Sequence, residues 1–220
     1  MTKRAPKRAL TNAELEGMRS QCASTRDAAV FEVLRVTGCR EHEMLAVRFQ
    51  DVDLENKSVF FHKTKASVRW KYKVEDGKRI RTHADSEIKP RMSPLDNQAV
   101  SALRIYIVER TREEGRNFTT TLKIFKMTEK TVFNLIKGLA ERAKLPDAKH
   151  VSPHWLRHTC GTKMLAAGME LPYIKKIMGW SPKSRTFEEN YDHTDFDMVQ
   201  ESFERVMEKR EKQKDKEGDA

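Results

Sequence analysis

Cysteine is scarce in this chain of 220 residues, which contains only Cys22, Cys39 and Cys160. Their odd number and the absence of C-x-x-C spacing argue against an oxidising compartment. Apolar runs of membrane-spanning length are also missing, and residues 1–10 lack the apolar stretch of a signal peptide. These absences together predict a soluble intracellular protein.

Acidic residues are too few to balance the basic ones, because 43 Lys and Arg stand against 33 Asp and Glu, a net charge of +10. The stretch 57–91 contains 11 basic and 4 acidic residues and so carries seven of these ten charges. A clustered basic excess favours a polyanionic partner, most simply nucleic acid. A basic solvated surface is the alternative that charge alone leaves open.

The first part of the chain is predicted to be helical after a flexible basic arm at residues 1–9. Thr11 to Glu14 has the pattern of a capping box and predicts a helix that continues to about Gln21. Residues 27–36 carry apolar side chains at helical spacing, which predicts a buried helix ending before Gly38. A short helix is expected just after Arg40.

The periodicity then changes to that of a strand. Residues 68–74 alternate strictly between β-formers and cations, and Asp76-Gly77 beside them is a tight-turn signal. Residues 58–62 and 87–92 are interpreted as the partner strands of a small antiparallel sheet.

Helical spacing returns after Asp96, and Gly168 and Gly179 suit helix ends. The predicted helices are at about 97–113, 128–144, 154–167, 171–178 and 195–210. Residues 208–220 are almost wholly charged, so we expect a disordered tail. The predicted fold class is mainly α with a small antiparallel β-sheet (α+β), in one domain over residues 10–207.

Ser152 and Pro153 suit the N-cap and the first position of a helix. His154 and Arg157 then lie in its opening turns and, at i and i+3, on one face. A helix N-terminus favours anions, and an imidazole and a guanidinium there predict a phosphate site.

A metal site is the alternative for the same helix, because His154 and His158 have i, i+4 spacing. Trp155 stands where a catalytic Glu would be needed, and Arg157 would place a fixed cation beside the ion. We therefore expect no metal and assign His158 to a supporting or packing role, with catalysis as the minority alternative.

Arg40 lies in the stretch Thr37-Gly38-Cys39-Arg40-Glu41-His42-Glu43. A lone arginine after a helix is commonly a surface residue. Glu43 at i+3 could instead fix its guanidinium by an ion pair, which favours a functional role.

Tyr191 lies in a polar stretch that packing explains poorly, and it follows Gly179-Trp180. The T-G-x-R-x-x-E stretch around Arg40, the H-x-x-R helix, the Gly-Trp pair and this tyrosine occur in one order. In that order they resemble the tyrosine recombinase (phage integrase) family, over roughly residues 10–203.

The resemblance implies a catalytic domain that breaks and rejoins DNA. Its implied catalytic residues are Arg40, Lys63, His154, Arg157, Trp180 and Tyr191, supported by Glu43 and His158. The two arginines would clamp the scissile phosphate and Tyr191 would attack it, giving a 3′-phosphotyrosine. Lys63 would act as the general acid, with Lys65 as a rival. The covalent ester stores the bond energy, so neither a cofactor nor a metal is expected.

The implied partner is double-stranded DNA, bound through basic residues at Lys65, Arg69, Lys71 and Lys73. We expect a monomer in solution, self-association on DNA into a tetrameric synapse, and a cytoplasmic location in a nucleoid or host cytoplasm. A viral or mobile-element role fits the resemblance. The family's separate N-terminal clamp domain has no room here, so we expect either a minimal protein or a piece of a longer one.

Two other functions stay open. A type IB topoisomerase uses a similar set of residues but relaxes supercoils, without needing a specific site or a second duplex. A non-catalytic helix-turn-helix protein could use residues 171–179 and the basic strand to bind DNA, although it would have no use for a phenol at Tyr191.

Overall fold

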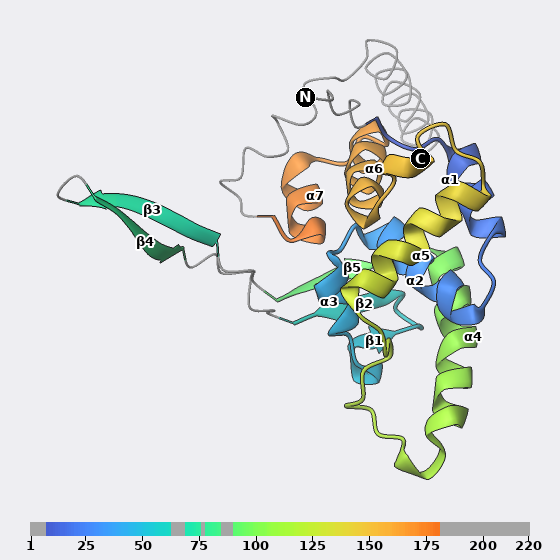
Figure 1. Cartoon of the computed structure of the whole chain (residues 1–220). Helices are drawn as coiled ribbons and strands as arrows, with labels where there is room; N and C mark the ends of the chain where they lie inside the picture. The colour runs from blue at the N-terminus through green and yellow to red at the C-terminus, as the bar shows by residue number, and fades with distance from the viewer. Residues whose placement is uncertain (1–7, 63–68, 76–77, 85–89, 181–220) are drawn as a thin grey trace, which may run out of the picture.

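Helices form the body of the molecule in the computed structural model, which describes residues 8–62, 69–75, 78–84 and 90–180 (Figure 1). The helices of this part are α1 (Asn12–Ser20), α2 (Thr25–Thr37), α3 (Glu41–Leu45), α4 (Asn97–Glu114), α5 (Glu129–Arg142), α6 (Pro153–Ala166) and α7 (Leu171–Met178). Short 3-10 turns occur at η1 (Phe49–Asp51), η2 (Gly115–Asn117) and η3 (Ala148–His150). Within the same part, no helix has both the length and the apolarity to cross a membrane. The predicted helix at 195–210 and the tail at 208–220 lie outside it.

Local signals set the ends of the first helices as expected. Thr11 and Glu14 form the complete capping box at the start of α1, and the Ser24 side chain caps α2. Gly38 ends α2 in the left-handed conformation, with φ of 56°. α2 is the central helix and packs against both α4 and α6, so its end is held inside the body.

Arg8, which was expected in the flexible arm, packs against the helical body. Its guanidinium pairs with Glu14 and Asp147 at 2.5 and 3.2 Å, and its carbonyl accepts a hydrogen bond from the Trp155 indole. The chain entering α1 is therefore tied to α6 at the opposite end of the sequence.

A three-stranded antiparallel sheet packs against the helices, in the order β1 (Val52–Asp53), β2 (Ser58–Phe61) and β5 (Arg91–Pro94). The register of β2 and β5 pairs Phe61 with Arg91. α7 packs against β5, which brings the end of the described chain beside this sheet.

The strand predicted at 68–74 belongs to a separate hairpin, so its predicted pairing is wrong. β3 (Arg69–Glu75) pairs with β4 (Lys78–Ala84), a strand that the sequence pattern did not reveal, while β2 pairs with β5. Glu75 pairs with Lys78 across a two-residue connection, and such a tight turn joins neighbouring segments first. Figure 1 shows this hairpin set apart from the helical body.

Candidate active site

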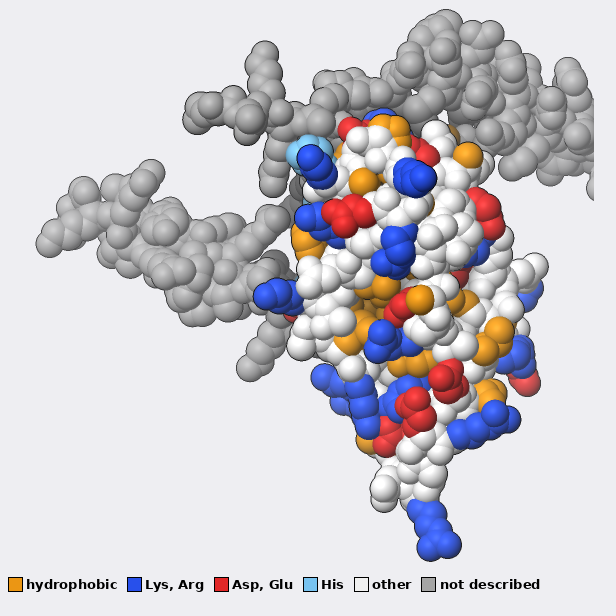
Figure 2. All heavy atoms as spheres, turned by 45° about the vertical axis from the view of Figure 1, so that its right-hand side comes forward, with side chains coloured by type: hydrophobic (Ala, Val, Ile, Leu, Met, Phe, Trp, Pro, Cys, Tyr) orange, Lys and Arg blue, Asp and Glu red, His pale blue; other side chains and the backbone are white. Residues whose placement is uncertain are grey.

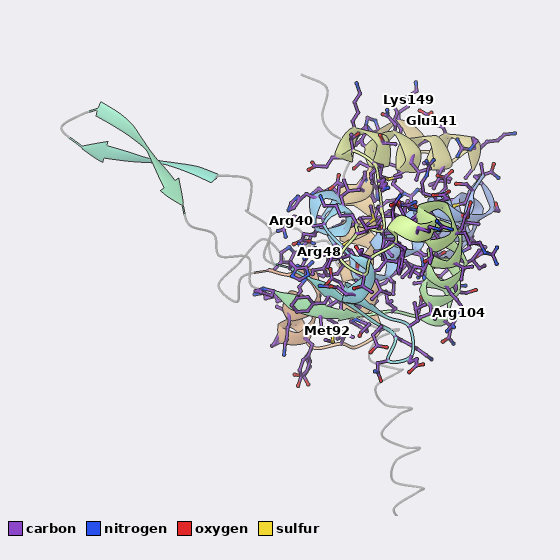
Figure 3. The ribbon with its side chains drawn as sticks, turned by 90° about the horizontal axis from the view of Figure 1, so that it is seen from below. Arg40, Arg48, Met92, Arg104, Glu141 and Lys149 are labelled. Atoms are coloured by element: carbon purple, nitrogen blue, oxygen red, sulfur yellow. The ribbon has the colours of Figure 1, made fainter. Side chains whose placement is uncertain are left out.

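Arg40 lies in the turn between α2 and α3, at the N-cap of α3. Its backbone N–H donates to Glu43 Oε2 at 2.8 Å, and its Nη1 lies 3.3 Å from Glu43 Oε1. The Arg40 side chain keeps 33% of its surface exposed, whereas that of Glu43 is fully buried. Figure 3 shows Arg40 on the side of the body toward the β3–β4 hairpin. The ion pair expected from the i, i+3 spacing is confirmed.

Arg91, which the sequence did not single out, is the stronger partner of Glu43. Its Nη1 and Nη2 donate to the two carboxylate oxygens at 2.9 and 2.8 Å, in a bidentate pair that is buried on both sides. Burial by itself would raise the pKa of Glu43, but the hydrogen bonds and charge of Arg91 outweigh it and lower that pKa to about 2. Glu43 is therefore a permanent anion at neutral pH.

Arg91 also fixes the end of α7. Its Nε donates to the Ile177 carbonyl at 2.8 Å, and its guanidinium lies 4.7 Å from the centroid of the Phe61 ring. Gly179, with φ of 64°, lies so close that a Cβ atom there would be 2.6 Å from Arg91 Nη1. This contact gives Gly179 a second requirement beyond ending the helix, because a larger residue would displace the arginine.

Arg157 projects from α6 into the same region and is only 4% exposed. Its Nη1 and Nη2 donate to the carbonyls of Gly38 and Met178 at 2.5 and 2.7 Å, and its guanidinium lies 5.1 Å from the centroid of the Trp180 ring. The two carbonyls end α2 and α7, where helix dipoles favour a cation. Burial lowers the pKa of Arg157, and the charge of Arg40 lowers it further, to about 10, so it stays protonated at neutral pH.

The start of α6 has the predicted form. Ser152 is the N-cap and Pro153 takes the first helical position, although the Ser152 side chain makes no capping hydrogen bond. His154 in the first turn is exposed, and His158 one turn later is half-buried. His154 and Arg157 thus share the first turns of one helix but differ in burial: the arginine faces the packed interior and the histidine solvent.

Positive charge exceeds negative charge in this cluster. Beyond the effect of burial, the charges of Arg40 and Arg91 both lower the pKa of Arg157, and in the described part of the chain Glu43 is the carboxylate that pairs with Arg40 and Arg91. The cluster therefore holds an excess of two positive charges beside a partly exposed guanidinium. Such an arrangement is suited to binding an anion with several oxygen atoms, such as a phosphate.

The remaining predicted site residues lie in the hairpin or outside the described residues. Lys63, Lys65 and Tyr191 lie outside the described residues. Arg69, Lys71 and Lys73 occupy alternate positions of β3 in the separate hairpin. Among the described residues, no group of three or more His, Cys, Asp or Glu could hold a metal ion.

Comparisons with known proteins identify the family of this chain. The sequence model of the Phage integrase family matches residues 7–198. Tyrosine recombinase XerC of Bacillus subtilis (strain 168) is 27% identical over 191 residues, covering 84% of this chain and 54% of the relative. Tyrosine recombinase XerC of Chlorobaculum parvum is 30% identical over 200 residues, with 84% and 50% covered. The chain thus spans about half the length of these relatives.

Solved structures show the same fold. The crystal structure of XerA recombinase superposes with a TM-score of 0.69 at 22% identity, covering 93% of this chain and 67% of the other. The Tn1549 transposon integrase in complex with transposon right end DNA gives a TM-score of 0.64, also at 22% identity, with 93% and 68% covered. The predicted resemblance and the predicted mainly α fold with a small antiparallel sheet are both confirmed.

Proposed function

Because the chain belongs to the phage integrase family, we propose that it is a site-specific recombinase that cleaves and rejoins DNA strands through a 3′-phosphotyrosine intermediate. The observation that carries this proposal is the cationic excess around Arg40, Arg91 and Arg157, which one buried carboxylate balances only in part. The relatives named tyrosine recombinase, and the integrase solved in complex with DNA, support the same substrate.

The proposed clamp uses two arginines at different depths. Arg40, one third exposed, donates to a non-bridging oxygen of the scissile phosphate. Arg157 adds a second positive charge from the buried side, where the low dielectric strengthens its field. Trp180 packs its ring near the Arg157 guanidinium, which helps to hold that charge in place. Both arginines thereby stabilise the negative charge that develops as phosphorus becomes pentavalent.

Tyr191 is the proposed nucleophile. Its phenolic oxygen forms a bond to phosphorus as the bond from phosphorus to the 5′ oxygen breaks. His154 takes the phenol proton and Lys63, with Lys65 as the alternative, protonates the leaving 5′ oxygen. The 5′-hydroxyl of a partner strand then reverses the step, so the ester bond energy is conserved without a nucleotide cofactor.

Covalent attachment to DNA tests this proposal. Wild-type protein incubated with fragmented genomic DNA of its source should form adducts that survive a denaturing gel and release one recurrent duplex sequence. Tyr191→Phe should form none while still binding that duplex, because only the nucleophilic oxygen is lost. Tyr173→Phe, at a 59% exposed position of α7, is the matched control and should react normally. An adduct from Tyr191→Phe would assign the nucleophile elsewhere, and relaxation of plasmids without the recurrent sequence would indicate a topoisomerase.

The basic hairpin is proposed to supply much of the sequence-independent affinity. Replacing Arg69, Lys71 and Lys73 by Gln should flatten the slope of log K against log salt by about 0.9 for each lost phosphate contact. An unchanged slope would show that β3 does not contact DNA. We also propose that the protein is monomeric in solution and assembles into a tetramer on paired sites, which mass photometry with and without the duplex would measure.

A further inference from the structure

Arg91 is buried beside the proposed phosphate clamp and belongs to none of the motifs that predicted the site. We propose that Arg91 is a positioning residue for strand cleavage, which holds the Glu43 carboxylate in the orientation that fixes the Arg40 guanidinium. This inference rests on the proposed function. It assigns Arg91 no contact with DNA, since its side chain is only 4% exposed.

The Glu43 carboxylate links the two arginines atom by atom. Its Oε1 accepts from Nη1 of Arg91 at 2.9 Å and lies 3.3 Å from Nη1 of Arg40. Its Oε2 accepts from Nη2 of Arg91 and from the Arg40 backbone N–H, both at 2.8 Å. The planar fork of Arg91 therefore sets the plane and rotation of the carboxylate, and that orientation decides where Arg40 is held.

Arg91 can do this because it is itself held in place on several sides. Its Nε is bonded to the Ile177 carbonyl, the Phe61 ring lies against the guanidinium, and the absence of a side chain at Gly179 makes room for it. Ser93, two residues along β5, donates to the same Ile177 carbonyl at 2.9 Å. A lysine could place one charge near Glu43, but it could not satisfy both carboxylate oxygens and the carbonyl together.

The position of Arg91 along the chain adds a connection between the site and the basic hairpin. β2 ends at Phe61 and β5 begins at Arg91, and these two residues pair across the strands. β3 and β4 lie between them in the sequence. The strands that precede and follow the hairpin in the sequence are thus paired at the residue that orients Glu43.

Arg110 provides a matched control for a purely structural role. It is 5% exposed, its Nε donates to the Ile124 carbonyl at 3.3 Å, and its two Nη atoms donate to Glu113 and Glu114. Arg110→Lys therefore removes another buried guanidinium that bonds a carbonyl and carboxylates, at a place far along the chain from Arg40. Arg91→Lys and Arg110→Lys should both lower stability, and only the first should affect Arg40.

The first measurement needs no DNA. NMR can record the Nε–Hε signals of arginine side chains on the free protein, below the melting temperature of each variant. The Arg40 signal reports the surroundings of its guanidinium directly. We expect Arg91→Lys to shift or broaden the Arg40 signal and Arg110→Lys to leave it unchanged. Glu43→Gln removes the shared carboxylate itself and gives the size of the shift expected when Arg40 loses its partner. An unchanged Arg40 signal overturns the inference.

The second measurement uses the duplex that wild-type protein cleaves. From the pre-bound complex, Arg91→Lys should form the covalent adduct about 10²-fold more slowly, as expected for a clamp displaced by about 1 Å, with DNA affinity unchanged. A scissile phosphate with methyl in place of one non-bridging oxygen carries no charge for Arg40 to neutralise. On that duplex, the loss of cleavage rate relative to wild type should become smaller for both Arg91→Lys and Arg40→Lys.

These outcomes separate the two proposals. If wild-type protein forms no adduct with any duplex, the proposed function fails and the NMR measurement still decides whether Arg91 positions Arg40. If wild-type protein cleaves but the methyl-substituted duplex leaves the Arg91→Lys defect unchanged, Arg91 acts on stability alone and the positioning role is rejected.

Discussion

Two regions of the molecule bury an arginine in nearly the same way but balance its charge differently. Around Arg110, Glu113 and Glu114 accept from the guanidinium at 2.6 and 2.5 Å, and Lys126 also pairs with Glu114, which leaves no net charge. Around Arg91, within the described residues, one carboxylate pairs with both Arg91 and Arg40, and the nearby Arg157 donates to backbone carbonyls instead. The charges of the first region cancel one another, whereas the second region keeps a net positive charge.

This difference separates a structural cluster from the cluster that we propose as a binding site. An uncompensated buried charge lowers stability, so it persists where a ligand of opposite charge completes it. The face over α4 and its neighbours shows the opposite arrangement, because basic and acidic side chains intermingle on it with apolar ones between (Figure 2). Such mixing of signs is typical of a solvated surface.

The largest expected effect is on stability. Arg91→Met should lower the free energy of unfolding by about 3–5 kcal/mol, because it leaves the Glu43 carboxylate buried without its main partner. Arg110→Met should cost less, since Glu113 is 56% exposed and can turn to water. Urea denaturation at neutral pH measures both. The double variant Arg91→Met with Glu43→Leu should recover much of the lost free energy of unfolding. Equal losses for Arg91→Met and Arg110→Met would contradict the difference between the two regions.

A second prediction compares the same regions by their effect on catalysis. Arg157→Lys should slow covalent adduct formation by about 10²–10³-fold, because an ammonium on a flexible stem cannot bond both helix-end carbonyls and so cannot hold its charge in the same fixed place beside the transition state. Arg110→Lys should leave that rate nearly unchanged. Single-turnover rates from pre-bound complexes measure the effect. Near-normal cleavage by Arg157→Lys would show that this arginine only joins the ends of α2 and α7.

The pH dependence of stability should separate Glu43 from the other carboxylates. Its pKa falls from an ordinary 4.5 to about 2 in the folded protein, so its stabilising contribution is complete above the unfolded value and is lost as the pH falls through about 2. The contribution corresponds to about 3 kcal/mol. The difference in unfolding free energy between wild type and Glu43→Gln should therefore shrink between pH 4.5 and 2. A constant difference over that range would mean that the pKa of Glu43 is not lowered by folding.

The smallest effect is expected at the outer edge of the balanced cluster. The Lys126 side chain is 59% exposed, so solvent screens its pairing with Glu114. Lys126→Ala should change the free energy of unfolding by no more than about 1 kcal/mol and should not affect cleavage. A larger loss, measured by thermal unfolding, would show that Arg110 depends on its neighbours as strongly as Arg91 does.

The sequence by itself determined what depends on neighbours along the chain. The capping box at Thr11, the helix start at Ser152-Pro153 and the left-handed end of α2 at Gly38 follow from backbone geometry within a few residues. The Arg40–Glu43 pair follows from i, i+3 spacing, and the order of motifs was sufficient to predict the family.

The tertiary structure decided which distant segments meet. In β5 the hydropathy of the side chains predicts the wrong residue to be buried, because the apolar Met92 is 62% exposed while the neighbouring Arg91 is buried. Strand alternation puts these neighbours on opposite faces, and only the packing of α7 and Glu43 against one face selects the arginine for burial. The pairing of β2 with β5 across the hairpin, and the bonds of Arg157 to two helix ends, are likewise contacts between residues far apart in sequence. Such contacts depend on the final packing of the chain, which no local pattern encodes.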